Sequence, residues 1–153
     1  MNVLVMIARI FLGLFLLANG LNFWFDWLPI ERPQSDEANV LMDGLVASGL
    51  FGVVKYVEVL AGIALLANRF VPLALALMLP LTLVICYVDY VLVVEPVPII
   101  FATLLVVPHT LLMIFHLRSY LAILACRAEP APPLPISAIW STMLAGASAK
   151  AKT

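Results

Sequence analysis

Four ionisable side chains stand inside segments that are otherwise apolar enough to enter a membrane. Lys55 and Glu58 lie three positions apart in the stretch "GVVKYVEVLAGIALLANRF". Arg9 interrupts the first apolar run of the chain, and His109 lies in the last. A charged group costs about 2.5–3.5 kcal/mol at the centre of a membrane helix, so such groups usually face the interior of a bundle and pair. These four residues are therefore the first candidates for chemistry.

Distances along the helices sort the charges by depth. Glu58 lies ten residues before Asn68, about 15 Å from that end of its segment, and Arg9 lies about 9 Å from the same side in the first segment. We therefore expect an Arg9–Glu58 pair, which either only fixes helix register or also lines a polar pocket or proton path. Lys55 lies one turn farther out, where it can snorkel to the interface. Its candidate partners are Asp26, Asp43 and Asp89.

The two histidines of the chain, His109 and His116, share one face of the last apolar segment. They lie about 10 Å apart along that face, too far for both to bind one haem iron. A bis-His haem within this chain is therefore excluded. His109 directly follows Pro108. It is either a hydrogen-bonded interior histidine or a contact for a quinone-like headgroup or a proton.

Two asparagines, Asn19 and Asn22, lie three positions apart on the first segment, on the face that carries Gly13 and Gly20. Small residues let helices approach closely, and amides can form hydrogen bonds across helices. Helix packing is the simpler interpretation of this face, and contact with a ligand is the alternative.

No metal site or catalytic set is expected from the remaining residues. Cys86 and Cys126 lie forty positions apart, without a C-x-x-C or metal-ligand spacing. They fall at ends of segments that we place on opposite sides of the membrane, so an intramolecular disulfide is not expected. No flavin or dinucleotide motif is present either.

The composition identifies the solvent around these groups. The 153 residues are 65% hydrophobic and 11% charged, with a mean hydropathy of +1.14. Soluble domains are about 45–50% apolar and about 25% charged. The chain is therefore expected in a lipid bilayer. A net charge of -1 and the absence of a basic run exclude nucleic acid as a partner.

We predict an all-α integral membrane protein with four transmembrane helices in a bundle. A short external amphipathic helix, N-capped by Ser35 and extending to about Phe51, should lie between spans 1 and 2. A transmembrane domain at 1–126 is expected to precede a proline-rich cytoplasmic tail at 127–153. The four predicted spans cover about residues 3–25, 53–68, 71–90 and 98–120.

The distribution of basic residues predicts the orientation. Four spans put both termini and the Asn68–Arg69 turn on one side, which receives most of the lysine and arginine. The opposite side receives most of the carboxylates. Because cytoplasmic segments are enriched in lysine and arginine, we expect both termini in the cytoplasm.

Two stretches together resemble a known family. "ARIFLGLFLLANGLNFW" carries Arg9 and two glycines, and "VEVLAGIALLANR" carries Glu58 and Gly62. Over roughly residues 3–125 the chain resembles the DoxX-like family of small four-helix bacterial membrane proteins. The resemblance implies a multi-pass protein of the bacterial inner membrane that is associated with redox systems, some of whose relatives are linked to quinone-reducing oxidoreductases. Family members often carry a lysine where this chain has Asn22, and we expect Lys55 to stand in for that lysine spatially.

Three functions remain open at this level. The first is a non-catalytic membrane subunit or anchor of a larger redox or respiratory-type complex, with other membrane subunits or a second copy as partners. The second is a quinone-binding or redox-active protein that uses Arg9, Glu58 and His109. The third is a small proton-coupled carrier, for which inverted repeats are lacking. No cofactor follows from a motif, and a quinone or a bound lipid is the candidate ligand.

Overall fold

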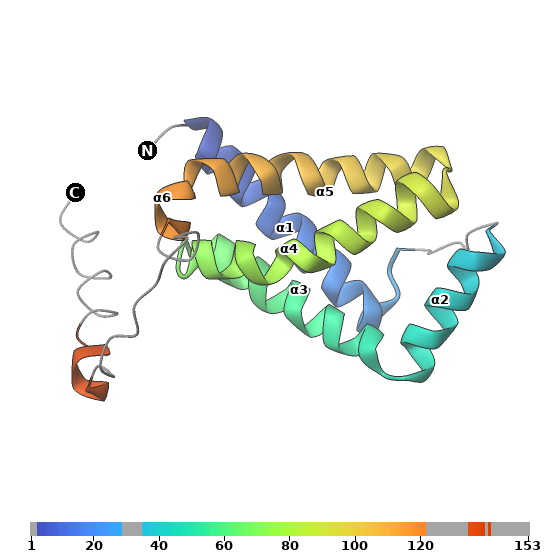
Figure 1. Cartoon of the computed structure of the whole chain (residues 1–153), viewed down its shortest axis with the longest axis horizontal. Helices are drawn as coiled ribbons and strands as arrows, with labels where there is room; N and C mark the ends of the chain where they lie inside the picture. The colour runs from blue at the N-terminus through green and yellow to red at the C-terminus, as the bar shows by residue number, and fades with distance from the viewer. Residues whose placement is uncertain (1–2, 29–34, 122–134, 140, 142–153) are drawn as a thin grey trace. The chain divides into compact units, whose positions relative to one another are not determined.

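The computed structural model describes residues 3–28, 35–121, 135–139 and 141 of the chain. Met1–Leu121 forms one compact unit, and Ala122–Thr153 forms a second. The predicted tail at 127–153 lies mostly outside the described residues, and its boundary stays a prediction. The elements of the first unit are α1 (Val3–Phe25), α2 (Asp36–Ala47), α3 (Leu50–Leu66), α4 (Val71–Tyr87), the π-helix η1 (Val88–Val93), α5 (Pro96–Phe115) and α6 (Leu117–Tyr120) (Figure 1).

The helices fit a membrane in length and composition. Three described helices are long and apolar enough to cross one: α1, α4 continued by η1, and α5. A fourth crossing is available if α2 and α3, which meet at 83°, count as one bent span. The protein is an all-α integral membrane bundle, as its composition predicts.

The second span differs from its predicted bounds because of one glycine. Gly49 adopts a left-handed backbone with φ of 77°, and α3 begins directly after it, at Leu50 rather than at 53. Ser35 caps α2 as expected, since its hydroxyl accepts a hydrogen bond from the Ala38 N–H at 3.2 Å. The amphipathic helix ends at Ala47, earlier than the expected Phe51. The corner at Gly49 thus lengthens α3 to 17 residues, about 25 Å.

Prolines set the bounds of the last two spans. Glu95 precedes Pro96 and is extended, with φ of -101° and ψ of 152°, because proline disfavours a helical conformation in the residue before it. The helical path of α4 therefore ends in the wider turns of η1, and α5 starts at Pro96 rather than at 98. The α5 helix ends at Phe115, and the predicted continuation to Tyr120 is the separate short helix α6.

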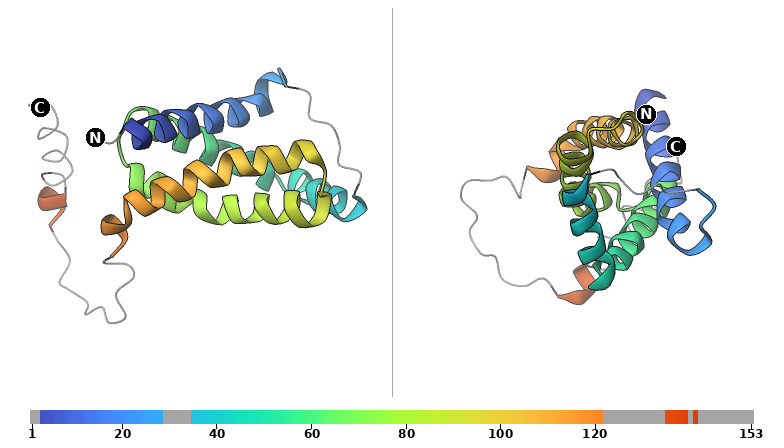
Figure 2. Two further views of the ribbon diagram at one scale, coloured as in Figure 1. Left: turned by 90° about the horizontal axis from the view of Figure 1, so that it is seen from above. Right: turned by 90° about the vertical axis from the view of Figure 1, so that its right-hand side faces the viewer.

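The four long helices form a closed bundle in the order α1, α3, α4, α5, with each helix packed against two neighbours. Figure 2 shows α4 and α5 running side by side. The closest approach is between α1 and α3. A Cβ added to Gly62 would lie 2.9 Å from the carbonyl oxygen of Gly13, and one added to Gly20 would lie 3.2 Å from the carbonyl oxygen of Lys55. Glycine at these positions lets the two backbones touch.

Candidate functional site

The two charges on α3 pair with each other. Lys55 Nζ lies 2.8 Å from Glu58 Oε2, and the side chains are 12% and 5% exposed. Lys55 Nζ also lies 5.2 Å from the centroid of the Phe51 ring. The partner of Lys55 is thus Glu58, and not one of the expected candidates Asp26, Asp43 and Asp89. Residues three apart on a helix are neighbours, so Glu58 is within reach of Lys55 without any contact between helices.

Arg9 is buried on α1 and contacts a different part of α3. Its Nη1 donates to the carbonyl oxygen of Leu65 at 3.0 Å, and its Nε has no hydrogen-bond partner. The whole residue is 8% exposed. Arg9 therefore joins two helices, but through a backbone carbonyl and not through a carboxylate.

The register of α1 against α3 explains why the predicted Arg9–Glu58 pair does not form. Gly13 lies against Gly62 and Leu66, and Gly20 lies against Lys55 and Val59. The antiparallel register thus places Arg9 beside the last turn of α3. Glu58 lies seven residues away from Leu65, about 10 Å along the helix. The depth estimate could not resolve this offset.

His109 is an interior histidine with both ring nitrogens engaged. Nε2 lies 3.0 Å from the Leu75 carbonyl oxygen, and Nδ1 lies 2.8 Å from Thr82 Oγ1. Because a carbonyl only accepts, Nε2 donates to it, and in the neutral ring Nδ1 accepts the hydroxyl proton of Thr82. The residue is 2% exposed. In this structure His109 joins α5 to α4 and presents neither nitrogen to a ligand.

The two asparagines of α1 act locally rather than across helices. Asn19 Nδ2 donates to the Phe15 carbonyl oxygen at 2.9 Å, one turn earlier on α1. Asn22 Nδ2 donates to the Leu28 carbonyl oxygen at 3.1 Å, while its Oδ1 accepts from the Leu28 N–H at 2.7 Å. Asn22 therefore holds the chain just after α1 in place, and both ends of its amide are used.

A cavity of about 400 Å³ lies between the helices and brings together side chains from α1, α2, α3, α4, η1 and α5. We call it the interhelical cavity. Its walls are apolar, with Phe15, Leu45 and Phe101 among them. The polar residues that line it are Asn19, Lys55, Glu58 and Asp89. Of the predicted site residues, the structure brings Asn19, Lys55 and Glu58 to this cavity.

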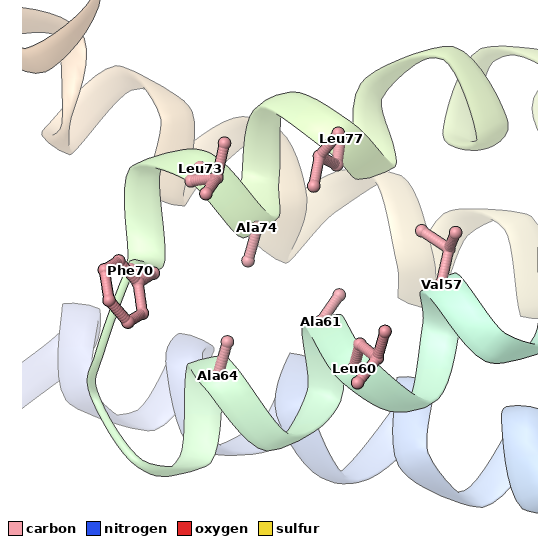
Figure 3. Close-up of a pocket in the computed structure, with 8 residues that line it drawn as sticks. All are labelled: Val57, Leu60, Ala61, Ala64, Phe70, Leu73, Ala74 and Leu77. Atoms are coloured by element: carbon pink, nitrogen blue, oxygen red, sulfur yellow. The ribbon is translucent and has the colours of Figure 1, made fainter.

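A second hollow, between α3 and α4, has a different character. This open groove of about 230 Å³ is lined only by apolar side chains, including Leu60, Ala61 and Leu77 (Figure 3). Leu60 and Leu77 are exposed on the surface of the bundle, where lipid tails would lie. A groove without a polar group cannot orient a headgroup, so it is not a candidate site.

Comparison with known proteins identifies the family of the chain. The DoxX family model matches residues 4–91, more than half of the chain. The chain belongs to the DoxX family. No curated protein and no solved structure matches it. The DoxX match reaches from α1 into η1 and so includes all four polar residues of the interhelical cavity, whereas His109 lies beyond it.

Two residues of this DoxX-family chain gain importance only from the structure. Thr82 holds the His109 ring, and nothing in the sequence signals a partner 27 positions away. Asp89 lines the interhelical cavity from the π-helix η1, whereas from the sequence it was only a candidate partner for Lys55. Wide π-turns are frequent at functional sites, and the cluster of Asp89, Glu95, Pro96 and Pro98 was the available signal.

Proposed function

We propose that this DoxX-family chain is a non-catalytic integral membrane subunit that holds a lipid-soluble ligand in the interhelical cavity. One observation carries the proposal: an apolar cavity of about 400 Å³ has the partly buried Lys55–Glu58 pair in its wall. Cavities of about 300–1,000 Å³ with apolar walls and a few polar groups are typical of small-molecule sites. A quinone is the ligand that the family resemblance suggests.

The shape of the cavity supports an amphiphilic ligand. Aromatic and aliphatic walls, such as Phe15, Phe101 and Leu105, suit a ring or an isoprenoid tail. The polar groups of Asn19, Lys55 and Glu58 come from α1 and α3 and suit a headgroup. Because the walls derive from every long helix and from α2, occupation of the cavity would stabilise the whole bundle.

Membership of a larger redox complex is the second part of the proposal, with the bacterial inner membrane as its location and both termini in the cytoplasm. The described residues form short connections between helices, which leave no room for a soluble catalytic domain within 35–121. The start of α1 and α6 lie at the same end of the bundle, as an even number of crossings requires (Figure 1). The redox chemistry would then belong to partner subunits.

Extraction of bound molecules tests the ligand. The full chain is purified in detergent, and its organic extract is compared by mass spectrometry with that of the host membrane. We expect one amphiphilic, lipid-soluble compound to be enriched. Leu45→Trp, which fills the cavity from α2, should lower its amount several-fold. Val40→Trp on the exposed face of α2 is the matched control, because Val40 is 74% exposed and does not line the cavity. Equal extracts from all three proteins would contradict the proposal.

Native purification tests the partner. The tagged full chain is isolated from its own membranes in a mild detergent, and co-purifying proteins are identified and quantified. We expect a stoichiometric membrane oxidoreductase subunit. A stable monomer that brings down no protein in stoichiometric amount would refute the subunit role, while the ligand measurement would still stand on its own.

A further inference from the structure

The described residues that line the interhelical cavity include more carboxylates than cations. Among the described residues that line it, Glu58 and Asp89 are the carboxylates and Lys55 is the one cation. Lys55 Nζ is already paired with Glu58 Oε2 at 2.8 Å. The described part of the wall therefore supplies no second cation for Asp89.

The residues that line the cavity also offer several hydrogen-bond acceptors to a ligand. Asn19 uses one N–H of its amide on the Phe15 carbonyl, so its second N–H and its Oδ1 can both face a ligand. A carboxylate only accepts hydrogen bonds, so Glu58 Oε1 and both oxygens of Asp89 are acceptors as well. A headgroup in the described part of this cavity therefore meets one excess negative charge, together with the carboxylate acceptors and the remaining N–H groups of Lys55 and Asn19.

We propose that the interhelical cavity selects amphiphilic molecules with a cationic nitrogen head, such as a long-chain amine. The ammonium group lies between Asp89 on η1 and Glu58 on α3, and the tail lies along the apolar walls. This inference rests on the proposed ligand-binding function and names its ligand class. A neutral quinone, whose carbonyl oxygens only accept, offers these carboxylates no donor, and a fatty acid would be repelled by them.

The strength of the preference follows from the surroundings. An exposed ion pair contributes little, because water screens it. A pair in a cavity walled by helices and lipid experiences a much lower effective dielectric, near 20, where one contact at about 4 Å changes an equilibrium by more than tenfold. We therefore expect an amine to bind at least about tenfold more tightly than an alcohol with the same tail.

Three probes with one tail test this selectivity: dodecylamine, dodecanol and dodecanoate. The full chain is reconstituted in phosphatidylcholine nanodiscs, with empty nanodiscs as the blank for partitioning, and binding is measured by competition with radiolabelled dodecylamine. Dodecylamine should bind most tightly and dodecanoate most weakly. Asp89→Asn should weaken amine binding at least about tenfold and alcohol binding much less, so that the amine preference falls, while Asp89→Glu retains the preference. Asp36→Asn is the control, because this α2 carboxylate is exposed and does not line the cavity.

The outcomes separate this inference from the proposed function. Equal binding of amine and alcohol, or tighter binding of a short-tailed quinone than of the amine, overturns the cationic class but leaves ligand binding intact. An Asp89→Asn protein that unfolds at the same temperature as the parent and keeps the amine preference also overturns it. If no probe binds above the blank and the organic extract holds no enriched compound, the proposed ligand site itself is wrong.

Discussion

Contact between α1 and α3 should make Gly62 intolerant of even one extra methyl group. A Cβ at this position would lie 2.9 Å from the Gly13 carbonyl oxygen, 3.0 Å from the Leu17 nitrogen and 3.2 Å from the Leu17 Cβ. Two of these three atoms belong to the backbone and cannot turn away, so the helices must separate. Overpacking of this kind typically costs about 1–3 kcal/mol. We expect Gly62→Ala to lower the free energy of unfolding by that amount, measured by circular dichroism during titration of detergent-solubilised protein with SDS.

Two glycines in the same protein serve as comparisons. At Gly13 the nearest atoms to an added Cβ belong to the Leu66 side chain, at 2.9 and 3.0 Å. A leucine side chain can turn, so Gly13→Ala should cost less than Gly62→Ala. At Gly44 on α2 no atom lies within 4 Å of an added Cβ, and alanine is favoured over glycine in a helix by about 0.5–1 kcal/mol. Gly44→Ala should therefore raise stability. If Gly62→Ala proves as stable as the parent, the close contact between the two backbones is wrong.

Three further substitutions test the polar contacts of the bundle by the same unfolding titration. Lys55→Met leaves the Glu58 carboxylate buried without its cation and should lower the free energy of unfolding by about 3–5 kcal/mol. The double variant Lys55→Met/Glu58→Leu should recover most of this loss. Equal stability of the single and double variants would contradict the pair. Thr82→Val removes the partner of His109 Nδ1 and should cost about 1–3 kcal/mol, but nothing further in a His109→Leu background. Tyr120→Phe removes the hydrogen bond to the first turn of α4 at 2.8 Å and should cost about 0.5–1.5 kcal/mol, with faster amide exchange across α6; unchanged exchange would count against that contact.

The class of fold could be predicted from the sequence, because composition alone decides it. A chain of this length that is 65% hydrophobic cannot bury all its apolar side chains away from water in a soluble fold, and its apolar runs are long enough to span a bilayer. The bounds of individual helices were less accurate at Gly49 and Glu95. A left-handed glycine and the residue before a proline change the chain direction locally. The hydropathy pattern does not mark the corner at Gly49, and the polar break around Glu95 does not show which of Pro96 and Pro98 begins the helix.

The partners of the charged groups could not be predicted, because they depend on the offset between two helices. Depth was estimated separately along α1 and α3 from their ends. That estimate did not resolve the offset of about two helical turns between Glu58 and Leu65, and so it paired Arg9 with the wrong residue. The offset is fixed by contacts at Gly13, Gly20 and Gly62, and the sequence gives no measure of it. By contrast, the Lys55–Glu58 pair needed only the three-residue spacing within one helix.

The pairing of Lys55 with Glu58 within a single helix bears on the role of these two charges. Two explanations were open for an ionic pair in the membrane: it holds helices in register, or it lines a pocket. A pair within α3 joins no two helices, so Lys55 and Glu58 cannot set the register of α1 against α3. The glycine contacts and the Arg9–Leu65 hydrogen bond account for that register without them. Lys55 and Glu58 hold no helices together and line a cavity of about 400 Å³, so they support the proposed ligand role rather than a packing role.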